Sequence, residues 1–151
     1  MSAQDPLSSL EDWVAPLLMR LTPGERRGLA RKVGQDLRRS QARRIAAQRD
    51  PDGGAYAPRK TTKARRRKGS IRRTMFAKLR TARHLRMQAE AQAVSIGFAG
   101  RTARIARVHQ EGLRDKVRAG GPIYGYPERR LLGLSDGERE LIRDLLLEHL
   151  T

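Results

Sequence analysis

The distribution of charge constrains this chain more than any other feature of its sequence. Residues 38–83 contain 17 Lys or Arg against two Asp, which gives this stretch a local net charge of +15. Its densest part, Lys60–Lys68, has almost no apolar residues. Such a segment cannot bury enough apolar surface to offset the entropy lost on ordering. We therefore predict an extended basic arm over residues 58–73.

The whole chain has the length of one compact domain. It contains 151 residues, of which 38% are hydrophobic and 4% aromatic, and its net charge is +17. We expect one domain over residues 1–151 that carries the arm, with a core built from Leu, Ile, Val and Ala. A charge this large attracts nucleic acid, an anionic membrane surface or an acidic protein. The alternative is that the cations only solvate the surface.

Two helices are predicted near the N-terminus. Apolar residues recur at three- and four-residue spacing from Leu7 to Leu21, including Trp13, as in a short amphipathic helix. Thr22-Pro23-Gly24-Glu25 then has the residues of a helix start, with a Thr N-cap and Glu three residues later. The second helix should run to about Gln48. Its apolar stripe consists of Leu29, Val33, Leu37 and Ile45. We expect a helical hairpin, with the short helix packed on the long one.

A change of period predicts a small antiparallel sheet further along the chain. Asp50-Pro51-Asp52-Gly53-Gly54 ends the second helix, because Pro blocks its continuation and the Gly pair supplies positive φ. Apolar and polar residues alternate over residues 85–89 and 94–98, which is typical of two strands joined by a turn. Residues 123–126 and 130–134 are candidates for further strands in the same sheet.

Two more helices follow from their periodicity and caps. Arg101–Gln110 should be helical, with Ile105 and Val108 on its buried side and its arginines outside. Ser135-Asp136-Gly137-Glu138 repeats the capping pattern and opens a final helix over residues 136–150. The expected fold class is therefore α+β. It consists of an N-terminal helical hairpin, a small antiparallel sheet and a C-terminal helix, with a basic extended arm.

The sequence offers few groups for catalysis. There is no cysteine, and the three histidines, His84, His109 and His149, do not share a ligand pattern with other histidines or acids. No phosphate-binding glycine loop is present, and Asp50 and Asp52 have the positions of turn formers. We expect no catalytic residue, no metal and no cofactor, and hence no enzyme.

The N-terminal residues and the hydropathy bear on location. The first ten residues are polar and acidic, where a signal peptide is basic and then apolar, and no apolar run approaches the roughly 20 residues that span a bilayer. We expect a protein made in the cytosol and used there or in a particle assembled there, with no membrane partner.

The basic arm provides the candidate binding residues. Its cations have the chemistry to neutralise phosphates without reading a base sequence, or to bind an acidic protein. They are Arg59, Lys60, Lys63, Arg65, Arg66, Arg67, Lys68, Arg72 and Arg73. The last 18 residues have the opposite sign, with five acids against two Arg. In a ring of identical subunits this polarity can favour head-to-tail contact, although the acids also suit a solvated helix face.

Several segments, in this order, resemble one known family. They are residues 10–13 (LEDW), 21–27 (LTPGERR), 48–58 (QRDPDGGAYAP), 73–79 (RTMFAKL), 103–112 (ARIARVHQEG) and 126–135 (YPERRLLGLS). Together they resemble the phage virion morphogenesis family, in its tail-completion group from contractile-tailed phages and related contractile bacteriocins. The resemblance extends from about Leu10 to Leu150.

The resemblance implies a structural tail assembly protein of α+β fold without catalytic residues. It implies a position at the head-proximal end of the tail, within the virion, after assembly in the bacterial host cytoplasm. The implied partners are further copies of the chain in a ring of six, tube or sheath terminator proteins, and head-neck proteins. From the charge alone, the alternative is a free-standing, non-specific nucleic-acid-binding protein.

Overall fold

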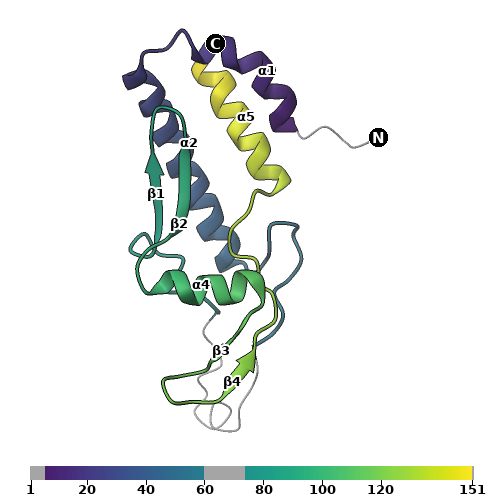
Figure 1. Cartoon of the computed structure of the whole chain (residues 1–151). Helices are drawn as coiled ribbons and strands as arrows, with labels where there is room; N and C mark the ends of the chain where they lie inside the picture. Colours follow the sequence, from purple (N-terminus) through teal and green to yellow (C-terminus); the bar gives the residue numbers. More distant parts are fainter. Residues whose placement is uncertain (1–5, 60–73, 151) are drawn as a thin grey trace. The chain divides into compact units, whose positions relative to one another are not determined.

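The computed structural model describes residues 6–59 and 74–150. Over these residues the chain has four helices and two antiparallel two-stranded sheets, which confirms the α+β class (Figure 1). In chain order the elements are α1 (Pro6–Leu18), α2 (Pro23–Ala46), β1 (Leu85–Ala89), β2 (Val94–Phe98), α4 (Thr102–Glu111), β3 (Arg114–Lys116), β4 (Ile123–Gly125) and α5 (Asp136–Leu150).

The chain divides into two compact units. Unit 1 consists of Met1–Ser40, Met87–Ile96 and Leu134–Thr151, and unit 2 of Gln41–Arg86 and Gly97–Gly133. That residues 1–151 form a single domain stays a prediction.

Both predicted capping motifs are formed. The Glu25 amide donates to Thr22 Oγ1 at 3.1 Å at the start of α2. At the start of α5 the exchange is reciprocal: the Glu138 amide donates to Ser135 Oγ at 3.1 Å, and the Ser135 amide donates to Glu138 Oε1 at 3.2 Å. These bonds satisfy backbone donors that have no partner inside the helix, and so define where α2 and α5 begin.

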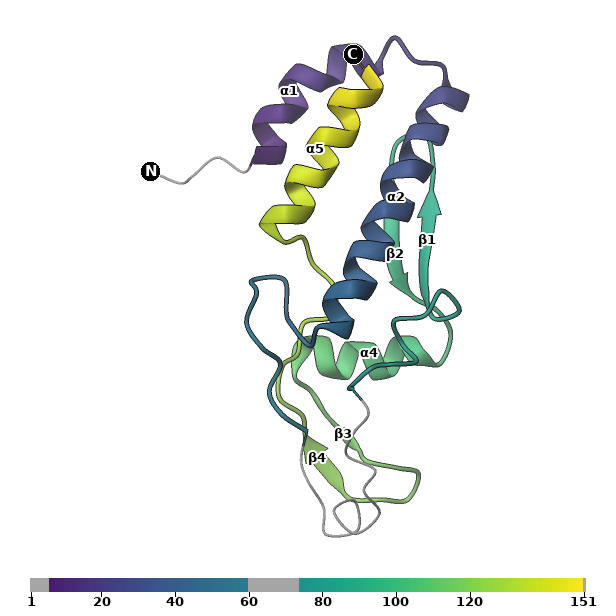
Figure 2. The same ribbon diagram turned by 180° about the vertical axis from the view of Figure 1, so that it is seen from behind.

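The core of unit 1 forms between α2 and α5. Its buried centre is Leu29, Val33, Leu37 and Leu145. The partly buried residues around it are Leu18, Leu21, Ile96, Leu134, Leu141, Ile142 and Leu146. The stripe predicted for α2 is thus correct. The prediction that α1 packs on α2 is wrong, because α1 packs on α5. Figure 1 and Figure 2 show α1 along α5 from opposite sides.

A glycine lets α2 approach the β1–β2 hairpin closely within unit 1. A Cβ placed on Gly34 would lie 2.6 Å from Cγ of Met87 and 3.0 Å from Cγ1 of Val94. Any larger residue at position 34 must therefore shift the side chain of Met87. The hairpin itself has the predicted strands, with a hydrogen bond from the Glu90 amide to the Ala93 carbonyl at its turn.

The second sheet differs from the prediction. Residues 123–126 do contain a strand, β4, but it pairs with β3 and not with the β1–β2 hairpin. The register places Arg114 opposite Gly125, Asp115 opposite Tyr124 and Lys116 opposite Ile123. Residues 130–134, predicted as a further strand, are irregular. There are accordingly two small sheets in place of one.

Two large apolar residues that were predicted to be buried are exposed. Trp13 in α1 is 52% exposed, and Ile105 in α4 is 50% exposed. In α4 the buried residues are Ala106 and Val108, of which only Val108 was predicted. Arg101, just before α4, and Arg104 and Arg107 within it are exposed as expected.

Candidate functional site

Most of the predicted basic arm lies outside the described residues. Of its nine cations only Arg59 is described, and it is half-buried in unit 2. The other eight, Lys60, Lys63, Arg65, Arg66, Arg67, Lys68, Arg72 and Arg73, fall within the undescribed range 60–73. What the structure does describe is how the chain is held just before and just after this range.

A buried arginine holds the chain before the arm. Arg129 is only 5% exposed. Its Nε donates to the Ala57 carbonyl at 2.8 Å, and its Nη2 donates to the Pro58 carbonyl at 3.0 Å. The planar guanidinium can reach two successive carbonyls at fixed geometry, which the point charge of a lysine cannot do. Burial lowers the pKa of Arg129, but an arginine keeps its charge in a protein.

A glutamine holds the chain after the arm. The Gln48 side chain lies two residues beyond the end of α2, where the backbone has a positive φ of 60°. Its Nε2 donates to the Met75 carbonyl at 2.9 Å, and its Oε1 accepts from the Met75 amide at 3.0 Å. One side-chain amide therefore satisfies both backbone groups of Met75. Two side chains of unit 2 therefore fix the chain on either side of residues 60–73: Arg129 before them and Gln48 after them.

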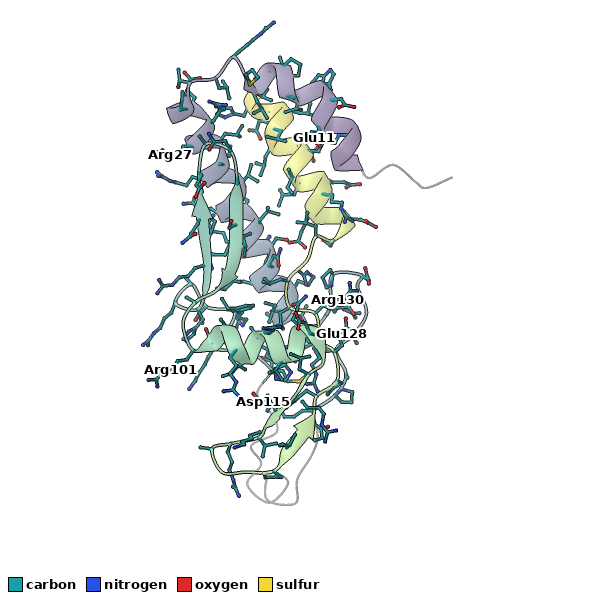
Figure 3. All side chains as sticks on the ribbon, in the orientation of Figure 1. Glu11, Arg27, Arg101, Asp115, Glu128 and Arg130 are labelled. Carbon is teal, nitrogen blue, oxygen red and sulfur yellow. The ribbon has the colours of Figure 1, made fainter. Side chains whose placement is uncertain are left out.

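The Asp50–Gly54 turn has the conformation that its residues predict. Asp50 Oδ1 accepts from the amides of Asp52 and Gly54 at 2.9 and 3.3 Å, and Gly53 has a φ of 89°. These bonds give Asp50 a structural role. Asp52 forms an ion pair with Arg130, which is labelled in Figure 3.

Five rings form a continuous row in unit 2. Successive rings meet edge to face in the order Tyr56, Phe76, His109, Tyr126 and Tyr124, with centroids 4.8–5.8 Å apart. This arrangement favours the positive edge of one ring against the negative face of the next. The row joins segments from both sides of the basic arm to α4 and to β4.

Two groups in this row have altered pKa values. Burial raises the pKa of Tyr56 to about 12, and its hydroxyl donates to the Arg130 carbonyl at 3.2 Å. Burial, followed by the charge of Arg129, lowers the pKa of His109 to about 4. Nδ1 of His109 lies 3.3 Å from Nη1 of Arg129, so it accepts, and the neutral ring carries its proton on Nε2.

Residues 129–133 form a strap held by side chains. The Gln110 amide group donates to the Leu132 carbonyl and accepts from the amides of Leu131 and Leu132 at 2.8–2.9 Å. Arg44 donates to the carbonyls of Leu131 and Gly133 at 3.3 and 3.0 Å. These bonds take the place of a strand ladder, which is the physical reason that the predicted strand is absent. Leu131 is fully buried beneath them.

Comparison with known proteins identifies the family of this chain. A model of the phage virion morphogenesis family matches residues 5–151. Tail completion protein S of Escherichia phage P2 is 40% identical over 141 residues, which cover 93% of this chain and 94% of that protein. The chain belongs to the phage virion morphogenesis family. No solved structure matches it.

In this member of the family, four of the recognised segments build one contact network. Residues 48–58, 73–79, 103–112 and 126–135 supply Gln48, Tyr56, Phe76, His109, Gln110 and Arg129. The sequence alone assigns no role to the buried polar residues in these segments. The one sequence signal for these residues is that they lie inside the segments resembling the family. Residue type gives no such signal, because Arg129 and Arg130 have the same chemistry and only Arg129 is buried.

Within residues 6–59 and 74–150 there is no group of three or more His, Cys, Asp or Glu placed to hold a metal ion. No helix in these ranges is long and apolar enough to cross a bilayer.

Proposed function

We propose that this protein is a structural tail assembly protein that completes a contractile phage-type tail. The observation that carries the proposal is the match over nearly the full length of both chains to the tail completion protein S of Escherichia phage P2. The family match over residues 5–151 supports the same role. A match of this extent involves both units, so it does not rest on one shared motif.

The proposed role is non-enzymatic. Groups with strongly altered pKa values often mark active sites, but they also occur in structural networks. Here the Tyr56 hydroxyl and His109 Nδ1 are each occupied by a contact that holds the fold. These contacts support a structural use of the altered groups.

The proposed position is the head-proximal end of the tail. There the protein forms a homo-oligomeric ring of six that caps tube and sheath and prepares the end for joining to a head. Its partners are the tube or sheath terminator proteins and the head-neck proteins. It is assembled in the cytoplasm of the bacterial host and stays in the virion. The sixfold number follows the symmetry expected of a contractile tail, and each contact is heterologous, as ring closure requires.

The basic arm is the proposed adhesive segment. Its cations from Arg59 to Arg73 contact acidic surfaces of a neighbouring protein, and contact of the same arm with the DNA backbone is the alternative. Arg129 and Gln48 support this role, because they fix the chain on either side of residues 60–73. Anchored ends reduce the entropy lost when the segment binds.

Deletion of the gene from its native genome tests the function. We expect incomplete tails by electron microscopy, with finished tails restored by an unaltered plasmid copy. Finished tails of normal length and stability in the deletion strain would show that the protein is not a tail completion subunit.

Non-specific nucleic-acid binding is the second candidate function, favoured by the net charge of +17. A free-standing binder would elute as a monomer, shift DNA at low salt and be absent from purified tails. A tail subunit should sediment with the tails. One sedimentation experiment therefore distinguishes the two candidate functions.

A further inference from the structure

The β3–β4 ribbon exposes one face without any described cover. In the observed register, Arg114, Lys116, Ile123 and Gly125 lie on one face, and Asp115 and Tyr124 lie on the other. All four residues of the first face are exposed, including Ile123 at 60%. This outer face therefore combines two cations, Arg114 and Lys116, with the exposed apolar side chain of Ile123.

The opposite face attaches the ribbon to unit 2. Asp115 accepts from Arg104 Nη2 of α4 at 2.7 Å, and the Tyr124 ring meets Tyr126 edge to face at 4.9 Å. Figure 3 labels Asp115 on β3 and Arg101 just before α4. A two-stranded ribbon alone is only marginally stable in water. These contacts hold it, so that its outer face is presented in one orientation to a partner.

The same chain carries a surface of opposite charge on α5. Asp136, Glu140, Asp144 and Glu148 recur at four-residue spacing and are all exposed. Like charges four residues apart destabilise a helix, so this row has a cost inside the monomer. Arg139 offsets part of it by pairing with Asp136 at 3.4 Å, and Arg143 is exposed on a neighbouring row. The remaining three carboxylates, Glu140, Asp144 and Glu148, lie along the helix surface.

We infer that the outer face of the β3–β4 ribbon docks on the acidic row of α5 in a second copy of this chain. This inference rests on the proposed ring and names the contact between neighbours. The spacings agree: residues four apart in a helix rise about 6 Å, and Arg114 and Lys116, two apart in a strand, lie about 6.8 Å apart. Both cations can thus face successive carboxylates, with Ile123 beside them.

A second copy is the occupant that the charges favour. The ribbon face and the α5 row have opposite sign and lie on different segments of the chain. A contact between two different surfaces of identical subunits is heterologous, and it closes into a ring when the rotation between neighbours is suitable. The exposed side chain of Ile123 adds apolar area that a purely electrostatic contact lacks. Nucleic acid is the other occupant for a basic ribbon, and the experiment below detects it.

A charge-swap experiment on the full-length protein tests the contact. One variant carries Arg114→Glu and Lys116→Glu, another carries Glu140→Lys and Asp144→Lys, and a third combines all four changes. Self-association is measured by analytical ultracentrifugation at low and moderate salt. Each double variant should weaken association about ten-fold or more, and the combined variant should recover most of the loss. Association of the unaltered protein should weaken as salt rises.

Matched controls place the same charge changes elsewhere. Arg27→Glu with Arg31→Glu changes exposed cations of α2, and Glu11→Lys with Asp12→Lys changes exposed acids of α1; Figure 3 labels Arg27 and Glu11. These controls should alter association far less than the ribbon and α5 variants do. Circular dichroism checks that every variant is folded.

Three results would overturn the inference. They are a protein that stays monomeric at low salt, double variants that associate like their controls, and a combined variant that recovers nothing. A ribbon variant that loses DNA binding while keeping self-association would assign the face to nucleic acid. Completion of tails by each variant is scored separately, so the ribbon contact can fail while the proposed tail function stands.

Discussion

Acid should destabilise unit 2 through one side chain, His109. Its ring is packed between Phe76 and Tyr126, and its Nδ1 lies against the guanidinium of Arg129. A protonated imidazole would place a second cation beside Arg129 in a partly buried site, and it would lose the acceptor at Nδ1. This is why burial and Arg129 lower the pKa of His109 to about 4 from its ordinary 6.5.

The sign and size of the effect follow from proton linkage. Between pH 6.5 and about 4 the unfolded chain binds a proton at His109 that the folded chain does not. The free energy of unfolding therefore decreases as the pH is lowered through this window. The loss is at most 1.36 kcal/mol per pH unit, or about 3 kcal/mol over the window. Since the ring is only partly buried, solvent screening reduces this to about 2 kcal/mol. Above pH 6.5 His109 contributes no further pH dependence.

Urea denaturation followed by circular dichroism measures this loss. The unaltered protein should unfold at a lower urea concentration at pH 4.5 than at pH 7. His109→Asn is the matched control, because its side-chain oxygen can still accept from Arg129 but does not titrate. The variant should be less stable at both pH values and lose most of the extra sensitivity between them. If the pH sensitivity of the variant equals that of the unaltered chain, His109 is not its source.

Four further results are expected. Arg129→Ala should lower the free energy of unfolding by about 2 kcal/mol, because it removes the donor to two part-buried hydrogen bonds, and Arg129→Lys should recover only part of this in the same denaturation assay. Ser135→Ala should cost about 1 kcal/mol by removing the N-cap of α5, measured as a shift in thermal midpoint. Reversing the charges of Arg65, Arg66 and Arg67 should leave circular dichroism unchanged and block tail completion in the deletion strain; finished tails would show that the arm is dispensable. The two units should unfold in one transition if the chain is a single cooperative domain, and two calorimetric peaks would contradict this.

The features that could be predicted from the sequence depend on residues close together in the chain. A cap requires residues three apart, as at Thr22 and Ser135, and both formed as expected. The β1–β2 hairpin depends on alternation over about ten residues, and its strands have the predicted ends. The apolar stripe of α2 was correct: Leu29, Val33 and Leu37 pack in the core of unit 1, and Ile45 is buried in unit 2.

The features that were missed depend on polar groups that meet over long separations. The buried side of α4 includes Ala106, with the half-buried polar residues His109 and Gln110, whose partners belong to the strap. The spacing of apolar residues in α4 therefore predicted Ile105 on the buried side of the helix, although it is half exposed. Arg129 bonds to Ala57, 72 residues away, and nothing in its local sequence distinguishes it from the less buried Arg130. Polar burial of this kind is set by tertiary partners, which periodicity does not reveal.

The position of the protein in a finished tail tests the central claim most directly. Tails purified from the native system, with this protein carrying a short N-terminal tag bound by gold, can be imaged by electron cryomicroscopy. We expect the label at the head-proximal end alone, on a ring with sixfold symmetry that is missing from tails of the deletion strain. Label at the distal end, along the sheath or absent from finished tails would contradict a head-proximal completion ring.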